Sequence, residues 1–419
     1  MTTTPAGDVL RKLRESRDLA LADAAAEIGI SVETLAAWEA GTVHPTEAQA
    51  TDYQDRLSSF DVEDEAQAEE SGSPFRYDIT SYGADYPVDG LVNRLNKGDV
   101  EVPKFQRGYV WTFAQACKFI ESFLLGLPVP GIFLYKDDES KKLIVIDGQQ
   151  RLRTLQYFYS GLFEDRAFKL AGVSTDLKGM AYKDLSDEQR RLLDDSILHA
   201  TIIKQERPEE EDRSSIYLIF ERLNTGGTPL TPQEIRTCVW RGEFVEALAS
   251  LNKDKNWRTV VGRAHPRMKD QELILRFFAM LHRSEDAHED KQRPPAYRRP
   301  MKRFLNSFIE FNVHLQHLSG TVLSDQFKKS IALAKGLADS RPFRLGGSSI
   351  NAAVFDSVMV GLAKRLQGRE QAPDRHCLQQ AYTRLLENAE YTKACSASTA
   401  DNEQVSLRMK LASEAFAAC

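Results

Sequence analysis

The sequence lacks the features that would point to a membrane protein, a secreted protein or a zinc protein. No apolar run approaches about 18 residues, so we expect no transmembrane helix. The N-terminus, MTTTPAGDVLRKL, has no signal-peptide pattern. The five cysteines are scattered, odd in number and never in a CxxC spacing. We therefore expect reduced, mostly buried thiols in a cytoplasmic protein, with no metal site.

Two common catalytic patterns are also missing. The chain has no Walker A sequence, so any NTPase would not be of the P-loop kind. Its eight histidines are isolated: His314 and His317 are expected to share one helix face, and His265 lies in a basic loop. A metal-dependent nuclease needs a histidine base with further His, Asp or Asn ligands nearby, and no such spacing occurs.

Charge is distributed unevenly along the 419 residues, whose net charge is −6. Residues 1–60 hold five basic and ten acidic residues, and residues 61–74 hold six acidic and no basic residues. The rest of the chain therefore carries a net charge of +5. A mildly basic body behind an acidic N-terminal part can approach nucleic acid or nucleotide. A normally solvated surface explains the same charge, so both interpretations stay open.

Residues 8–56 have a helical hydrophobic period. Gly29 is expected to end one helix, Ser31 to cap the next with Thr34 at its third position, and Gly41 to end it. Two helices joined by a short Gly-containing turn form a helix-turn-helix. The spacing S-x-x-T-L-x-x-W-E-x-G resembles the Xre/Cro-type repressor family.

The second helix of such a module would lie in the major groove and read bases through its N-terminal side chains. The candidate DNA-binding residues there are Ser31, Glu33 and Thr34, with no Arg, Lys, Asn or Gln among their neighbours. Candidate phosphate contacts are Arg11, Lys12, Arg14 and Arg17. Because the module is net acidic, a dimerisation or protein-docking role on the same fold is the alternative to operator binding.

Composition and periodicity predict an α+β protein in four parts. Residues 131–137 and 142–148 read as two short strands, followed by a helix, and the chain beyond 240 reads mostly helical. The expected parts are a helix-turn-helix at 1–60, an acidic flexible linker at 61–76, an α+β core at 77–240 and a helical extension at 241–419.

The stretch IVIDGQQRLRTL, residues 144–155, carries the strongest chemical signal. A strand that turns sharply at Gly148 into a helix leaves backbone N–H groups and the positive end of the helix dipole at the turn. That arrangement is a ready anion site, commonly filled by phosphate. The polar side chains beside it are Asp147, Gln149, Gln150, Arg151 and Arg153.

These side chains suit a phosphate site. The two arginines add guanidinium groups that match phosphate oxygens, and the two glutamines can address a base, a ribose or an attacking water. Asp147 could hold Mg²⁺ or cap the helix. In the structural alternative Asp147 caps, Gly148 turns and the rest is solvated surface.

Two further stretches point to the same kind of ligand. Residues 102–116, VPKFQRGYVWTFAQA, place polar and aromatic side chains just before a helix, which suits stacking and phosphate contact. These side chains are Gln106, Arg107, Tyr109 and Trp111, and the alternative is that the two aromatic rings anchor the loop on the core.

The other stretch, residues 220–236, reads FERLNTGGTPLTPQEIR. Thr231 and Glu234 form a predicted capping box, with Pro232 at the first helical position. The turn before it consists of Asn224, Thr225, Gly226 and Gly227. Two consecutive glycines allow another backbone or a ligand to approach closely.

The motifs FQRGYVW, GLPVPGIFLY, DGQQRLRTL and FERLNTGGTPLTPQEIR, in that order, resemble the N-terminal domain of GmrSD-type, modification-dependent restriction systems. That domain belongs to the wider ParB/sulfiredoxin-like superfamily with its D-G-Q-Q-R signature. The C-terminal run YTKACSASTADNEQVSLRMKLASEAF is similar to the end of such domains, so the resemblance covers most of residues 77–419. The HNH-like nuclease signature that usually follows in a second domain is absent from this sequence.

The resemblance implies a nucleoside triphosphate (ATP, GTP or CTP) with Mg²⁺, and a role in defence against phage DNA through modified bases or phosphorothioate linkages. It implies DNA, including modified phage DNA, a separate nuclease subunit and further copies of this chain as partners. The implied catalytic residues are Asp147, Gln149, Gln150 and Arg151. The implied nucleotide-binding residues are Gln106, Arg107, Tyr109, Gly148, Arg153, Thr154, Asn224, Thr225, Gly226 and Gly227.

Three functional interpretations follow. In the first, nucleotide binding or hydrolysis at residues 147–153 gates DNA engagement or a partner that cuts DNA. In the second, the protein is a helix-turn-helix regulator of a defence operon without catalysis. In the third, the chain itself nicks DNA.

Overall fold

The computed structural model describes residues 10–11, 14–15, 21, 24–25, 30–46, 49–50, 53, 60–61, 79–103, 109, 111–137, 140–163, 165–205, 214–223, 230–286, 292–338, 341–345, 349–367 and 373–419. The chain divides into two compact units. Residues 74–230 form one, here the α+β unit, and residues 1–73 with 231–419 form the other, here the helical unit. The division at 230 falls ten residues before the boundary expected from the sequence.

The α+β unit is built on a five-stranded mixed sheet in the order β2-β8-β4-β5-β3. The strands are β2 (Ile79–Pro87), β3 (Val100–Glu101), β4 (Ile132–Lys136), β5 (Leu143–Asp147) and β8 (Ile197–Gln205). β2 is antiparallel to β8, β8 is parallel to β4, β4 is antiparallel to β5, and β5 is parallel to β3. The predicted strands at 131–137 and 142–148 are confirmed as β4 and β5.

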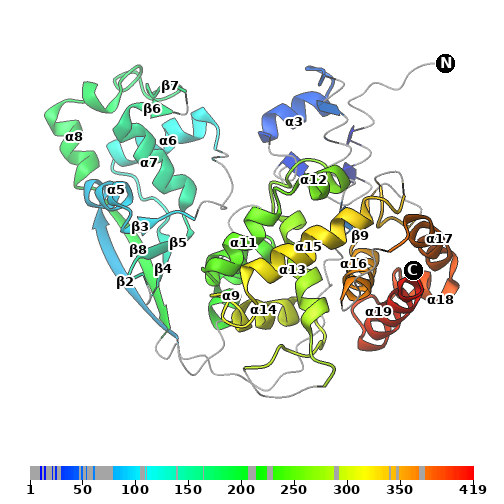
Figure 1. Ribbon diagram of the computed structural model, residues 1–419. Coiled ribbons are helices and arrows are strands. Elements are labelled where there is room, and N and C mark those ends of the chain that lie inside the picture. The colour runs from blue at the N-terminus through cyan, green and yellow to red at the C-terminus, as the bar shows by residue number, and fades with distance from the viewer. Residues whose placement is uncertain are drawn as a thin grey trace. The chain divides into compact units, whose positions relative to one another are not determined.

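Helices gather beside this sheet (Figure 1). They are α5 (Val88–Lys97), α6 (Phe113–Leu124), α7 (Gln149–Ser160) and α8 (Asp187–Asp194), with the 3-10 turn η1 (Tyr182–Asp184). A further helix of this unit, α9 (Ser214–Leu223), contacts β5. A small hairpin joins β6 (Leu162–Phe163) to β7 (Arg166–Ala167). Four consecutive residues of β5, from Leu143 to Ile146, are buried, because this strand has a neighbour on each edge and is covered on both faces.

The helical unit is organised around α16 (Ala352–Leu366), which contacts α13, α15 and α19. The other helices are α10 (Pro232–Val239), α11 (Glu243–Leu251), α12 (Lys255–Val261), α13 (Lys269–His282), α14 (Met301–Phe311), α15 (Gly320–Ala334), α17 (Arg375–Glu387), α18 (Ala389–Ala394) and α19 (Asn402–Ala417). A Cβ at Gly361 would lie 2.8 Å from the Ala412 carbonyl oxygen, so glycine lets α16 and α19 approach closely. The predicted helical extension and the α+β class are confirmed.

The helix-turn-helix part is described around α3 (Val32–Glu39). The Ser31 hydroxyl accepts from the Thr34 N–H at 3.1 Å and Gly41 adopts a φ of 71° after the helix, as predicted. Leu35 and Trp38 lie in a small core with Tyr53. Gly29 lies outside the described residues. A short strand β1 (Phe60–Asp61) pairs in parallel with β9 (Ile350–Asn351), so the first residue of the expected linker belongs to a strand.

Two sequence expectations are corrected by the structure. Cys117, Cys238 and Cys395 are buried free thiols, and burial raises the pKa of each, but Cys377 and Cys419 form a disulfide. The contact between α17 and α19 explains the pair, because it brings the two Cα atoms to 5.6 Å across 42 residues of sequence.

The expectation that His314 and His317 share a helix face is also wrong. α14 ends at Phe311, and Leu315 adopts a φ of 56°, which a continuing helix does not allow. The Asn312 carboxamide accepts from the His317 N–H at 3.0 Å and fixes this turn. Among the described helices, none is long and apolar enough to cross a membrane.

Candidate functional site

The junction between β5 and α7 is a tight left-handed turn at Gly148. Its φ is 99°, a conformation that residues with a side chain rarely adopt. A Cβ at this position would lie only 2.3 Å from Cγ2 of Ile132 on the neighbouring strand β4. Glycine is therefore required both by the backbone conformation and by the close approach of β4. The predicted turn is confirmed, but the contact with Ile132 has no local pattern in the sequence and was not predicted.

Replacing Gly148 with alanine should lower the free energy of unfolding of the α+β unit by about 2–4 kcal/mol, from left-handed strain together with the clash against Ile132. Gly161→Ala is the matched control. Gly161 ends the same helix with a φ of 75°, but nothing lies within 4 Å of its added Cβ. Denaturant unfolding of both variants should show a larger loss for Gly148→Ala. Equal losses would show that the contact with Ile132 contributes nothing.

Helix α7 begins without a side-chain cap. Its N-cap residue is Gly148, which has no side chain to accept from the first-turn N–H groups. Asp147 does not cap the helix as the structural alternative required, since its Oδ2 accepts from Arg151 Nη2 at 2.6 Å. The helix start keeps the positive potential of its dipole, and a guanidinium group is fixed one turn into the helix. Both features favour an anion at this junction.

Arg151 and Asp147 are only partly covered, with side-chain exposures of 16% and 31%. The ion pair occupies one guanidinium nitrogen of Arg151. Its Nε, like the Nε of Arg153, is buried and has no hydrogen-bond partner among the described residues. Buried polar atoms in proteins are nearly always paired, so a ligand or water is expected beside these two atoms.

The loop before α6 contacts α7 at two described positions. The Gln150 side-chain carbonyl accepts from the Trp111 backbone N–H at 3.3 Å. The Thr154 hydroxyl donates its one hydrogen to the Gln150 backbone carbonyl at 2.7 Å. Thr154 must therefore accept in its contact with Tyr109, whose hydroxyl donates to it at 2.6 Å. Two of the predicted stretches are therefore brought together in space, at residues that lie about 40 positions apart.

The aromatic rings of this loop are used in packing. Tyr109 lies edge-on to Tyr157 and Phe163, at centroid distances of 5.1 and 5.2 Å. Trp111 packs on Phe119 at 5.3 Å. This matches the alternative in which both rings anchor the loop on the core. Thr154 is fully buried, and its contacts position Tyr109.

Six of the predicted nucleotide-binding residues lie outside the described residues: Gln106, Arg107, Asn224, Thr225, Gly226 and Gly227. α9, the helix that directly precedes Asn224, contacts β5, the strand that ends at Asp147. This contact brings the chain before the predicted Asn-Thr-Gly-Gly turn next to the strand that carries the candidate site.

The candidate DNA-reading residues lie at the start of α3. The hydroxyls of Ser31 and Thr34 lie 2.9 Å from each other and are exposed, and Ser31 also caps the helix. Arg14, a candidate phosphate contact, is instead held by Glu39 through two hydrogen bonds of 2.8 and 2.9 Å. The hydrogen bond to Glu39 raises the pKa of Arg14. The Arg14 guanidinium group therefore pairs with a carboxylate within the module, and the structure does not support the phosphate contact expected of it.

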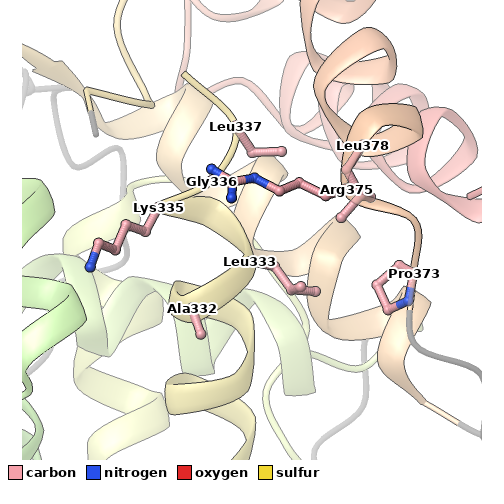
Figure 2. Close-up of a pocket in the computed structure, with 8 residues that line it drawn as sticks. All are labelled: Ala332, Leu333, Lys335, Gly336, Leu337, Pro373, Arg375 and Leu378. Carbon is pink, nitrogen blue, oxygen red and sulfur yellow. The ribbon is translucent and has the colours of Figure 1, made fainter. Parts of the chain in front are cut away.

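A pocket of about 280 Å³ lies elsewhere, in the helical unit (Figure 2). Its lining consists of Ala332, Leu333, Lys335, Gly336, Leu337, Pro373, Arg375 and Leu378. The Arg375 side chain crosses it above Gly336. None of the residues predicted for nucleotide or DNA binding lines this pocket, so it does not belong to the candidate site.

Comparison with known families identifies two domains. Residues 88–240 match the GmrSD restriction endonuclease, N-terminal domain, and residues 10–53 match a helix-turn-helix. No curated protein matches the chain. The two domains predicted from the motifs are confirmed, and the first match contains the whole β5–α7 junction. The match ends at residue 240, so the resemblance expected for residues 241–419 stays a prediction. Both domains point to a DNA-associated protein, since a helix-turn-helix is a DNA-binding fold and the other family is named for restriction.

Proposed function

We propose that the GmrSD N-terminal domain of this chain binds a nucleoside triphosphate at the β5–α7 junction, and that binding or hydrolysis controls action on DNA in a bacterial restriction system. The observation that carries the proposal is the uncapped start of α7 beside the Asp147–Arg151 pair. Backbone N–H groups and a guanidinium group then face one small region, and a phosphate group satisfies both.

The contacts suggest a role for each side chain. Arg151 holds a phosphate with the guanidinium N–H groups that Asp147 leaves available, and Asp147 orients Arg151. Gln150 ties this turn to the loop at Trp111, and Gln149 is the candidate for positioning a water or a base. A nucleotide would arrive with Mg²⁺, which prefers phosphate oxygens and one or two carboxylates, and Asp147 is the nearest carboxylate in sequence.

The direct test is equilibrium binding of ATP, GTP and CTP to the purified full chain, with and without Mg²⁺. We expect one of the three to bind with a dissociation constant in the micromolar range and to be displaced by its unlabelled form. Absence of binding by all three, at concentrations up to millimolar, would contradict the proposal.

A second candidate function is supported by the helix-turn-helix match at residues 10–53. In it the protein regulates its own operon, and the α+β unit responds to an effector without catalysis. Tight, salt-sensitive binding to the promoter of its own operon in the absence of nucleotide turnover would favour this function over the first.

A further inference from the structure

The positive charge of the chain is concentrated in one part of it. Residues 231–419 hold 29 basic and 21 acidic residues, a net charge of +8, whereas residues 75–230 hold 21 basic and 24 acidic residues, a net charge of −3. The basic character that could draw the protein to nucleic acid therefore lies outside both the helix-turn-helix and the nucleotide-binding unit.

Within this basic part, residues 292–303 stand out, and we call them the basic strap. The strap and the six residues after it contain no Asp or Glu. Arg293, Arg298, Arg299 and Arg303 are exposed. The strap leads into the N-terminus of α14, whose N-cap Pro300 makes no side-chain cap, so the helix dipole adds to the positive potential there.

The backbone of the strap is fixed by groups other than its arginine side chains. The Ser284 hydroxyl donates to the Pro294 carbonyl at 2.7 Å, and Ser284 and Ala296 form an isolated bridge. The Tyr297 hydroxyl donates to the Ala400 carbonyl at 2.6 Å, and its ring lies edge-on to Phe304 at 5.1 Å. A strap held in this way presents its cations on an ordered backbone.

Most of these cations have no partner among the residues that the structure describes. Among the described residues, the side chains of Arg293, Arg298 and Arg303 form no hydrogen bond or ion pair. Arg299 pairs with Asp401 at 3.0 Å, but both side chains are largely exposed, so the pair is weak and can exchange. Exposed guanidinium groups of this kind suit phosphate oxygens.

We propose that the basic strap is a second DNA contact, which binds the phosphate backbone of duplex DNA without reading sequence. The choice of DNA rests on the DNA association in the proposed function, because the chain already carries a helix-turn-helix. The strap supplies the basic charge that this acidic module lacks. It would hold DNA while the nucleotide site acts, and it binds DNA whether or not nucleotide is bound.

The test is fluorescence anisotropy of a 30-base-pair duplex of arbitrary sequence with the full chain, over a range of salt concentrations. The variant is Arg293→Ala, Arg298→Ala and Arg303→Ala together. Its matched control removes three exposed cations of the same unit: Lys328→Ala, Lys364→Ala and Arg384→Ala. We expect the strap variant to lose at least about tenfold in affinity and about three units of salt slope, and the control to change less than about threefold.

Each other outcome overturns the proposal. Unchanged DNA affinity in the strap variant would show that the strap does not contact DNA. Equal losses of affinity in both variants would show that only the net charge of the unit matters. A loss confined to single-stranded RNA or to phosphatidylserine vesicles would assign the strap to that partner instead. Unchanged thermal unfolding and unchanged nucleotide binding in both variants separate this test from failure of the fold or of the nucleotide proposal.

Discussion

Arg151→Ala is expected to lower the affinity for nucleotide by about 100-fold while the protein stays folded. A charge-assisted hydrogen bond contributes about 1.5–3 kcal/mol, and about 2.7 kcal/mol corresponds to a factor of 100. The substitution also leaves the Asp147 carboxylate without its cation, and that negative charge then repels phosphate. Equilibrium binding of the nucleotide that the native chain prefers is the measurement.

The fold should survive this change because the pair is partly exposed. A partly exposed ion pair of this kind contributes about 1 kcal/mol or less. Arg191→Ala, on the exposed face of α8, is the matched control and should bind nucleotide as the native chain does. The nucleotide affinity of Arg151→Lys should lie between those of Arg151→Ala and the native chain, because lysine keeps the positive charge but lacks the planar guanidinium group. Affinity within twofold of native for Arg151→Ala would remove this residue from the site.

Asp356→Asn is expected to lower the free energy of unfolding by about 3–5 kcal/mol, since it leaves buried cations without a counter-charge. Asp356 is fully buried on α16, and both its carboxylate oxygens accept from Arg276, the shortest contact being 2.6 Å. Nη2 of Arg408 on α19 lies 4.0 Å away. The three residues lie on α13, α16 and α19, so the carboxylate balances the buried guanidinium charges where these helices meet.

The pKa values of the two arginines show the same balance. Burial lowers the pKa of Arg276, but the charge of Asp356 and the hydrogen bonds to it outweigh burial, so the net shift is upward. Burial also lowers the pKa of Arg408, and there the more distant Asp356 does not compensate. Removing the carboxylate charge would therefore leave both guanidinium groups in a poorly solvated interior.

Denaturant unfolding of the full chain measures this loss, with Asp325→Asn as the control. Asp325 pairs with Lys329 at 3.1 Å on the exposed face of α15, where both side chains are mostly accessible. Its substitution should cost less than about 0.5 kcal/mol. If the free energy of unfolding of Asp356→Asn lies within about 1 kcal/mol of the native value, the buried Asp356 network does not stabilise the helical unit as proposed.

The parts of this fold that were predictable from sequence are those set by local chemistry. Ser31 with Thr34, and Thr231 with Glu234, form helix caps as their spacing predicts. Short apolar runs predict the strands β4 and β5. Gly148 and the change to a helical hydrophobic period after it predict the start of α7. The candidate site follows from the same local chemistry, because the strand, Gly148 and the polar side chains after it are adjacent in sequence. The pair of Asp147 and Arg151 spans only four residues, from the end of β5 to the first turn of α7.

The parts that were missed depend on tertiary structure. Ile132 meets Gly148 only because β4 pairs with β5, and Cys377 meets Cys419 only because α17 packs on α19. The helical period around His314 and His317 gave no sign of the left-handed residue that interrupts it. The Asp356 network has no local pattern at all, since its members are separated by 80 and 52 residues along the chain.

Phosphate release from ATP, GTP and CTP by the purified chain measures nucleotide turnover at the β5–α7 junction. The reaction contains Mg²⁺, with and without modified phage DNA, and Arg151→Ala is measured beside the native chain. We expect release from one nucleotide, stimulated by DNA and lost in the variant. If no nucleotide is hydrolysed under any condition, or if the variant hydrolyses as fast as the native chain, nucleotide turnover at the β5–α7 junction is contradicted and the regulator function gains support.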